Sequence, residues 1–262
     1  MVKNVPSWYH HLILFKSGNM TYKIVLKSSS KHIDRVDNCL KTWLSSLNYV
    51  IITDKLTGAP NELSMSRDDN YQSNEEKTVN FINYVQANPD QFTEDWLVFI
   101  DDDAILNIPM FEIIGPHLEK NHVYGHKMKG SYKKDPELDY PSGGCGYFIS
   151  PELIKKCKPM AMKGYGYEDV CMGKWLEENR VRIHDKYMIG SLMSPLRLNG
   201  WFPFQKHFEK LWQQGDSYVP TMLAELTEED VTFLRKHVTH HYIRHKSFME
   251  YLHKLLNEKS PS

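Results

Sequence analysis

Continuous apolar runs and helical spacing alternate along the first part of the chain. Apolar runs at 22–26 and 49–53, and a third that ends at Ile100, predict strands buried on both faces, as in a parallel sheet covered by helices. Between the runs, apolar residues recur at helical spacing in two segments, 33–47 and 75–85, the second of which is followed by Pro89. The apolar positions of the first segment are Ile33, Val36, Leu40, Trp43, Leu44 and Leu47. The order strand, helix, strand, helix, strand predicts a mostly parallel α/β sheet flanked by helices, with right-handed crossovers.

Shorter elements are expected in the rest of the chain. They are helices at 109–118 and 151–157, strands at 122–124 and 147–149, and two tail helices at the C-terminus. Ser150 is suited to cap the helix that follows it, and Thr227 with Asp230 resembles a capping box that begins the first tail helix. The polar segments 56–73 and 127–135 are expected to be surface loops.

The length and composition fit a single α/β domain over 1–262. Lys and Arg number 32 against 33 Asp and Glu, a formal net charge of −1, which argues against binding nucleic acid or an anionic membrane over the whole surface. No apolar run approaches the ~18 residues of a transmembrane segment. Four cysteines lack the short paired spacing of a zinc ribbon, which favours free, mostly buried thiols in a reducing compartment. They are Cys39, Cys145, Cys157 and Cys171.

Three aspartates end the third apolar run, in the sequence WLVFIDDDAIL. Ligands bind at the carboxyl edge of open α/β sheets, so Asp101, Asp102 and Asp103 are candidates for a site. Two like charges ~4 Å apart repel by roughly 4 kcal/mol at an effective dielectric of ~20, so the cluster needs a cation or protonation. Strand geometry places Asp101 and Asp103 on one side and Asp102 on the other, which supplies two hard oxygen ligands for Mg²⁺ or Mn²⁺. The alternative is that the aspartates only end the strand and begin a turn.

Two further stretches carry residue types that serve chemistry. In YPSGGCGYFIS, Gly143 and Gly144 allow the backbone to approach a ligand closely. In GYGYEDVCMG, Glu168 and Asp169 open a helix whose positive end favours an ionised carboxylate, which makes this pair a candidate for a general base. Capping of the helix is the alternative role for the acidic pair.

Polar residues also follow the first two strands. Ser28 and Ser29 come directly after the first strand, Arg35 lies on the first turn of the next helix, and Asp54 ends the second strand. Hydroxyls and cations after a first strand are candidates for contacts with a phosphate or a uridine. An ordinary polar loop is the alternative.

Four histidines crowd a short segment near the C-terminus. Their spacing is compatible with a transition-metal site, and a solvated surface cluster is the alternative. They are His237, His240, His241 and His245.

Taken in this order, the motifs resemble those of the fringe-like inverting β-1,3-glycosyltransferases, the family that includes the core 1 β-1,3-galactosyltransferases. The matching pieces cover most of residues 22–176: KSSSKHIDRVDNCLKTWL after the first strand, TD at the end of the second, FIDDDAIL, GGCGYFIS and YEDVCMG. The resemblance implies a GT-A fold, a donor that is usually a UDP-sugar, and Mn²⁺ or Mg²⁺ held by the DxD aspartates and a later histidine. It also implies a nucleotide-binding half at 22–106 and, at 107–262, an acceptor-binding half with C-terminal helices.

The resemblance also implies roles for residues at matching positions. Asp169 corresponds to the family's catalytic base, with Glu168 as its neighbour. The expected metal ligands are Asp101, Asp103 and a histidine: His241 in VTHHYI, with His207 in FQKHFEKL as its rival. The residues expected to bind the nucleotide-sugar donor are Ser28, Ser29, Arg35, Asp54, Asp101, Asp102, Gly143 and Gly144.

The implied reaction transfers a hexose or N-acetylhexosamine, with inversion, from a UDP-sugar to an acceptor hydroxyl in a β-1,3 linkage. The acceptor is a glycan, a glycoprotein or a small molecule. Two alternatives are a metal-dependent nucleotidyl- or phosphotransferase and a non-catalytic relative that binds a glycan or a client protein. The chain as given lacks the family's N-terminal membrane anchor and most of its luminal cysteines. This favours a cytoplasmic relative, whereas an excised catalytic domain would belong in the lumen of the secretory pathway.

Overall fold

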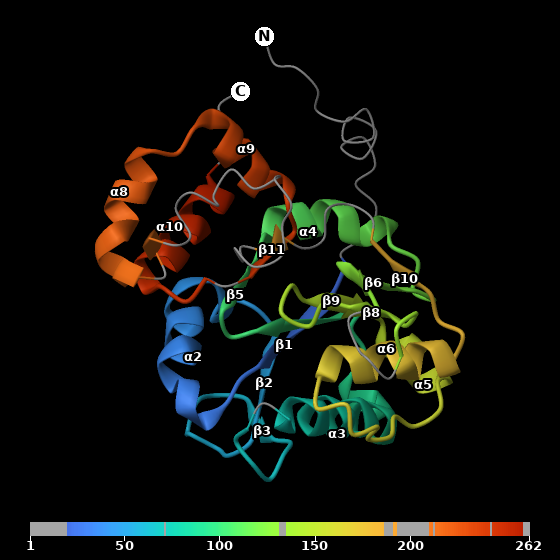
Figure 1. The fold of residues 1–262 in the computed structure, drawn as a ribbon. Coiled ribbons are helices and arrows are strands. Elements are labelled where there is room, and N and C mark those ends of the chain that lie inside the picture. Colours follow the sequence, from blue (N-terminus) through green and yellow to red (C-terminus); the bar gives the residue numbers. More distant parts are fainter. Residues whose placement is uncertain are drawn as a thin grey trace.

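The computed structural model describes residues 20–70, 72–130, 135–185, 191–192, 210–211, 213–241 and 243–258. In these residues, seven strands form a central sheet in the order β10-β6-β9-β4-β1-β2-β3 (Figure 1). The strands are β1 (Tyr22–Lys27), β2 (Tyr49–Thr53), β3 (Glu62–Ser64), β4 (Trp96–Asp101), β6 (Val123–Gly125), β9 (Tyr147–Ile149) and β10 (Ile183–His184). All neighbouring pairs in this sheet are parallel except those of β9, which runs antiparallel to β4 and β6. The expected mostly parallel α/β sheet is confirmed.

Two small sheets lie beside the central one. β5 (Ala104–Leu106) pairs antiparallel with β12 (Thr239–His241), which also pairs with β11 (Ser191–Leu192). β7 (Lys127–Lys129) pairs with β8 (Asp139–Pro141). Because β5 directly follows the three aspartates, its pairing with β12 brings a C-terminal segment to the carboxyl end of β4.

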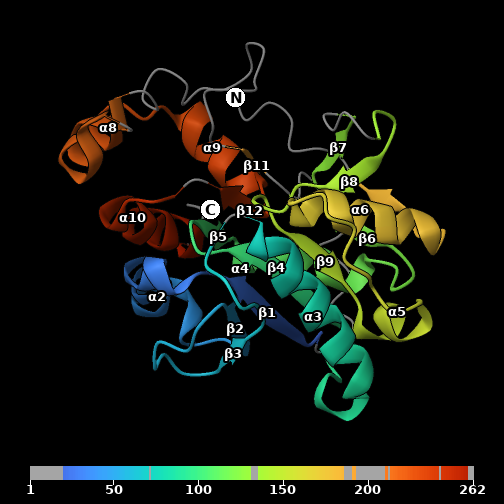
Figure 2. The same ribbon diagram turned by 60° about the horizontal axis from the view of Figure 1, so that its bottom comes forward.

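Helices cover both faces of the central sheet (Figure 2). On one face lie α3 (Ser73–Ala87), α5 (Pro151–Lys156) and α6 (Glu168–Glu178), and on the other α2 (Ile33–Cys39), α4 (Ile108–Ile114) and α10 (Lys246–Asn257). Two more helices, α8 (Val219–Ala224) and α9 (Glu228–Lys236), precede β12. No helix in the described ranges has both the length and the apolar character needed to cross a membrane.

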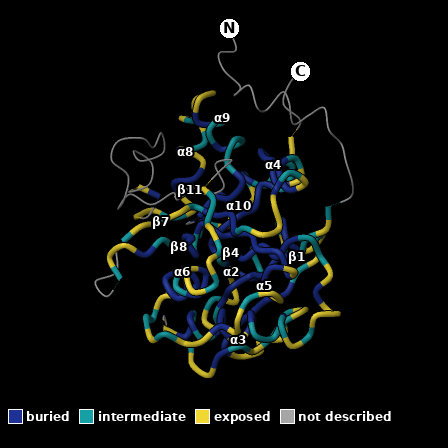
Figure 3. Tube along the Cα trace, turned by 90° about the vertical axis from the view of Figure 1, so that its right-hand side faces the viewer, coloured by how far each residue is buried: buried dark blue, intermediate teal, exposed yellow. Residues whose placement is uncertain are grey.

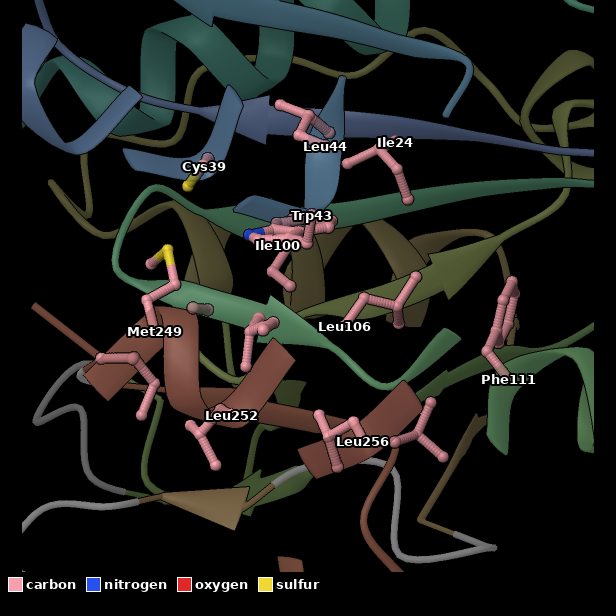
Figure 4. Packing of buried hydrophobic residues seen from close by; sticks show 14 of the residues in the cluster. Ile24, Cys39, Trp43, Leu44, Ile100, Leu106, Phe111, Met249, Leu252 and Leu256 are labelled. Atoms are coloured by element: carbon pink, nitrogen blue, oxygen red, sulfur yellow. The ribbon is translucent and has the colours of Figure 1, made fainter. Parts of the chain in front are cut away.

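The two faces of the sheet divide the core into two large clusters. Successive side chains of a strand point to opposite faces, so Val25 and Phe99 pack with α3 and α6 whereas Ile24 and Ile100 pack with α2 and α10. Figure 3 shows the buried strands in the interior, with the exposed segments outside. In Figure 4, Trp43 and Leu252 belong to the same cluster as Ile100. Full burial of such a side chain contributes roughly 1.5–3 kcal/mol, so both clusters hold the strand ends firmly in place.

Two segments that were expected to be surface loops contain edge strands. Residues 62–64 form β3 and extend the sheet beyond β2, while 127–129 form β7. Both strands pair through backbone groups at an edge and leave most of their side chains exposed or half-buried. They therefore lack the apolar alternation by which a strand is predicted.

The predicted helix through Leu47 is also interrupted. α2 ends at Cys39, and Leu40–Leu44 continue as a π turn in which the Thr42 hydroxyl donates to the Asn38 carbonyl at 2.6 Å. Helix caps were predicted more successfully. Ser150 accepts from the backbone N–H of Leu153, and Thr227 forms the expected capping box.

Candidate functional site

The carboxyl ends of β1 and β4 form the floor of the candidate site. Lys27, the last residue of β1, is the register partner of Asp101, the last residue of β4. Asp102 and Asp103 form the turn into β5, and the backbone N–H of Asp102 donates to the Lys27 carbonyl at 3.1 Å. All three aspartates therefore lie at the ligand-binding edge that the sequence indicated.

Asp101, Asp103 and His241 converge on one point. One potential ligand atom from each side chain lies within 4.8 Å of the other two. His241 Nε2 is 3.1 Å from Asp103 Oδ1 and 3.9 Å from Asp101 Oδ2. The histidine reaches this position because His241 in β12 is the register partner of Ala104 in β5. His207, the rival ligand, lies outside the described residues.

Asp102 points away from this group, as the strand geometry predicted. Its Oδ2 accepts a hydrogen bond from Ser28 Oγ at 2.7 Å, and its Oδ1 lies 3.4 Å from Arg35 Nη1. Burial raises the pKa of Asp102 to about 7, against the opposing effect of the Ser28 hydrogen bond.

Basic side chains of the chain itself balance the three aspartates. Lys27 Nζ is 2.9 Å from Asp101, and Arg244 Nε donates to Asp103 at 2.9 Å, while Arg35 faces Asp102. Burial opposes ionisation of Asp103, but His241 and Arg244 hold its pKa well below the usual range. Burial likewise opposes protonation of His241, yet Asp103 raises the pKa of this imidazole to about 10. We expected that the cluster needs a bound cation or protonation. In the fold, the side chains of Lys27, Arg35 and Arg244 already supply positive charge to it.

The donor set nevertheless fits a divalent metal. Two carboxylates and one imidazole form a mixed oxygen and nitrogen site that suits Mn²⁺. The side chain of Asp101 is 33% exposed, so a ligand can reach the group from solvent, whereas Asp103 and His241 are buried.

The glycine loop lies between the metal-capable group and the acidic pair on α6. A Cβ atom on Gly144 would overlap the imidazole of His241, and one on Gly143 would overlap the carboxylate of Glu168. The loop is tied to β12 by the Thr239 hydroxyl, which donates to the carbonyl of Cys145. Close contacts within the protein therefore require glycine at both positions. From the sequence we had explained these glycines only by the close approach of a ligand.

Glu168 and Asp169 open α6 but have different surroundings. Glu168 is buried, pairs with Lys27, and accepts weaker contacts from Tyr147 Oη at 3.3 Å and Thr78 Oγ1 at 3.4 Å. Asp169 is only half-buried. Its Oδ1 accepts a hydrogen bond from the backbone N–H of Val170 at 2.9 Å, in the first turn of α6. Burial is the main cause that raises the pKa of each carboxyl group.

Two of the expected donor-binding residues after β1 and β2, Ser29 and Asp54, are held by hydrogen bonds with neighbouring loop residues. Ser29 Oγ donates to Asp69, and Ser30 donates to Asp54 through its backbone N–H and its hydroxyl, both at 2.8 Å. Burial opposes ionisation of Asp54, but the Ser30 hydrogen bonds keep its pKa below the usual value. These side chains order the rim of the site beside Asp102.

Three basic residues of the site were missed in the sequence. Lys27 and Arg244 contact the aspartates, and the buried Lys77 of α3 donates to the Ser28 carbonyl at 2.6 Å. Lys27 directly follows the apolar run YKIVL, at the same sheet edge as Asp101, so its position was a usable signal. Lys77 and Arg244 lie among other charged residues in the sequence, so nothing in the sequence singled them out.

The cysteines do not take part in the metal-capable group. Cys39, Cys145 and Cys171 are buried and Cys157 is half-buried, all as free thiols. Of the four histidines near the C-terminus, His240 is fully buried and its Nε2 lies 2.9 Å from the Leu234 carbonyl. The solvated surface alternative for this cluster is therefore wrong for His240 and His241.

Comparisons with known proteins place the chain in a family. A sequence profile of the Fringe-like family matches residues 22–246, whereas a comparison with curated protein sequences gives no match. Similar solved structures include the glycosyltransferase GlyE of Streptococcus pneumoniae TIGR4, with 12% identity over 91% of this chain and 63% of that one, at a TM-score of 0.42. The bifunctional glycosyltransferase WbbM has 10% identity over 93% of this chain and 51% of its own, at 0.45.

A third similar structure is the galactosyltransferase LgtC, with 8% identity over 91% of this chain and 97% of that one, at a TM-score of 0.39. This chain spans less than two thirds of the GlyE and WbbM chains. Likenesses as distant as these carry no argument about activity, so the assignment rests on the family profile. That profile spans most of the chain and every motif of the candidate site, and the protein therefore belongs to the Fringe-like family.

Proposed function

We propose that this glycosyltransferase is metal-dependent and inverting, and that it transfers a hexose or N-acetylhexosamine from a UDP-sugar to an acceptor hydroxyl in a β-1,3 linkage. The observation that carries the proposal is the convergence of Asp101, Asp103 and His241 beside a glycine loop. In this loop Gly144 lies against His241 and Gly143 lies against Glu168, the neighbour of Asp169. This arrangement supplies a place for a diphosphate-bound metal and, across the loop, a carboxylate for the acceptor.

Asp101, Asp103 and His241 are the residues that would hold Mn²⁺ or Mg²⁺. When bound, the metal supplies Lewis-acid stabilisation of the negative charge on the departing diphosphate. Arg244 and Lys27 already contact two of these ligands and hold their carboxylates in fixed orientations. Such supporting contacts commonly matter for metal affinity nearly as much as the ligands do.

Asp169 is the proposed general base. It is half-buried, so an acceptor hydroxyl can approach its carboxylate, while its raised pKa increases its basicity. Removal of the hydroxyl proton would prepare the acceptor oxygen to attack the anomeric carbon on the face opposite the diphosphate. Attack from that face converts an α-linked donor into a β-linked product.

The residues around the ends of β1 and β2 are proposed to bind the nucleotide. Ser28, Ser29, Arg35 and Asp54 offer hydroxyl, guanidinium and carboxylate groups at the rim next to Asp102. Gly143 and Gly144 would allow the donor sugar to lie close to the backbone. In this arrangement 22–106 is the nucleotide-binding half, and 107–262 provides the acceptor side.

A screen of four donors tests the proposal. Purified protein is incubated with UDP-glucose, UDP-galactose, UDP-GlcNAc or UDP-GalNAc, with Mn²⁺ or with EDTA, and release of UDP is measured. We expect release from at least one donor with Mn²⁺ and none with EDTA, and a β-configured product when an acceptor is supplied. Consumption of a nucleoside triphosphate without UDP-sugar turnover would instead identify a nucleotidyl- or phosphotransferase.

A further inference from the structure

One buried ammonium group joins the two sides of the site. Lys27 Nζ lies 2.9 Å from Asp101 Oδ1, donates to the Gly143 carbonyl at 3.0 Å, and pairs with Glu168 Oε1. The lysine side chain is 6% exposed and that of Glu168 is 8% exposed, so both charges are shielded from water. An ammonium has three donors, and these three acceptors account for all of them.

The three acceptors come from three separate motifs. Asp101 ends β4, Gly143 belongs to the glycine loop, and Glu168 opens α6. The three residues are far apart in sequence, and Lys27 contacts all of them at the site. A change at Lys27 should therefore disturb the metal side and the acceptor side together.

The same contacts separate the roles of two adjacent acidic residues. Glu168 is buried, engaged by Lys27 and flanked by Tyr147 and Thr78, so it offers no free oxygen to an acceptor. Asp169 is more exposed, and its carboxylate accepts hydrogen bonds from backbone N–H groups, those of the neighbouring Val170 and of Gly143. Only Asp169 is placed to accept a proton from a substrate.

We propose that Lys27 is a positioning residue that holds Asp101, the Gly143 carbonyl and Glu168 in fixed relation, and that Glu168 serves as its counter-ion and not as a base. The proposal rests on the proposed function for its catalytic consequences. The pairing of Lys27 with Glu168 is independent of any substrate and can be tested without one.

The experiment combines a stability cycle with UDP binding. Lys27→Met, Glu168→Gln and the double variant are compared by urea unfolding, and Mn²⁺-dependent UDP binding is measured by calorimetry. Lys27→Met leaves the buried carboxylate of Glu168 without a cationic partner, so we expect this variant to show the largest fall in the urea midpoint of unfolding. The double variant should recover most of that fall, because neither buried charge remains.

Recovery of stability without recovery of binding is the specific signature of positioning. We expect the folded double variant to bind UDP with Mn²⁺ about 10- to 100-fold more weakly than the wild type, because Asp101 has lost its supporting contact. Lys23→Met with Glu94→Gln is the matched control, since this 2.9 Å ion pair lies at the opposite end of β1. The control should bind UDP as the wild type does.

Turnover separates the two carboxylates. Asp169→Asn should lower kcat by about 100-fold or more, whereas Glu168→Gln should lower it by less than about tenfold. Wild-type UDP affinity in the double variant, or equal losses of kcat in the two acidic variants, would overturn the proposal. Absence of UDP binding and turnover in the wild type would refute the proposed function, and the stability cycle would still decide whether Lys27 and Glu168 depend on each other.

Discussion

At the scale of single residues, the site is held by close contacts that leave little space. The imidazole of His241 fills the position that a side chain at residue 144 would need, and Asp103 and Arg244 hold charges next to it. Gly144 does not have a positive φ, so its glycine identity is explained by space alone. A single methyl group at this position therefore tests the geometry directly.

Gly144→Ala is expected to displace His241 and to weaken Mn²⁺ binding by at least about tenfold, while the protein remains folded. Calorimetric titration with Mn²⁺ measures the affinity. Gly58→Ala is the control. Its φ of 92° strains the backbone of an alanine, but no atom lies within 4 Å of the added Cβ and the residue is outside the site, so the Mn²⁺ affinity should not change. Unchanged Mn²⁺ affinity in Gly144→Ala would remove His241 from the ligand set.

The role of Asp169 as a base predicts how kcat falls on the acid side of its pH profile. Burial raises the pKa of this carboxyl group, and a base acts only when ionised, so kcat should fall as the pH drops through that raised pKa. The midpoint should lie above the ordinary aspartate value of about 3.9. The profile is measured with saturating Mn²⁺ at each pH, because protonation of His241 competes with the metal. A midpoint at or below the ordinary value would contradict the assignment of Asp169.

At the scale of elements, the metal-capable group depends on how β12 is attached to the β5–α4 connection. Asn107 caps α4 by accepting the Met110 N–H, and its amide donates to the carbonyls of Arg235 and His237, both at 3.0 Å. Its backbone N–H also donates to the Val238 carbonyl at 2.7 Å. One buried side chain thus fixes the segment that leads into His241.

Asn107→Ala is expected to lower the free energy of unfolding by about 2–4 kcal/mol, because one helix cap is lost and two part-buried carbonyls lose their hydrogen-bond donor. Asn107→Asp keeps an acceptor for the cap but not the donors, so it should lose most of the same stability. Urea unfolding measures both variants. Asn48→Ala, which removes an exposed bond to Glu94, is the control and should cost no more than about 0.5 kcal/mol. Full stability of Asn107→Asp would show that only the cap matters.

Local patterns predicted the parts of the molecule that are continuous in sequence. The run that ends at Ile100 forms β4 together with Asp101, so the sheet edge followed from the apolar run. Asp102 and Asp103 lie in the turn after β4, and the predicted separation of Asp102 from its neighbours is present although these two residues are outside the strand. Ser150 and the Thr227 capping box are likewise local, and the structure confirms both. The edge strand β3 was missed because it pairs through its backbone and buries little apolar surface.

Contacts between distant segments could not be derived in this way. Nothing near His241 in the sequence reveals that β12 pairs with β5. The spacing of the four histidines made the cluster a candidate metal site, and the resemblance to a family singled out His241 within it. Arg244 was missed because isolated basic residues occur throughout the chain, and its contact with Asp103 joins distant segments. The position of Lys27 after the first strand was a signal, but its contact with Asp101 likewise joins residues far apart in sequence. The separate surroundings of Glu168 and Asp169 depend on the same long-range contacts.

At the scale of the whole molecule, the site lies where the two parts of the chain meet. β1 and β4 supply Lys27 and the aspartates, while the glycine loop, α6 and β12 supply the remaining groups. The match to the Fringe-like family covers all of these elements. The central claim is that the junction binds a UDP-sugar through a divalent metal.

Asp103→Asn tests the metal side of that claim. The substitution removes the negative charge that holds His241 and Arg244, so Mn²⁺ affinity should fall by at least about 100-fold. Loss of Mn²⁺-dependent UDP release should accompany it, and circular dichroism should show a folded protein. Full Mn²⁺ affinity in this variant would place the metal elsewhere.

The most direct measurement is a calorimetric titration of the wild-type protein with UDP, in the presence of Mn²⁺ and again with EDTA. The metal-dependent account predicts saturable binding of one UDP per chain with Mn²⁺ and at least about 100-fold weaker binding without it. Equal UDP affinity in both titrations, or no UDP binding in either, would contradict the account.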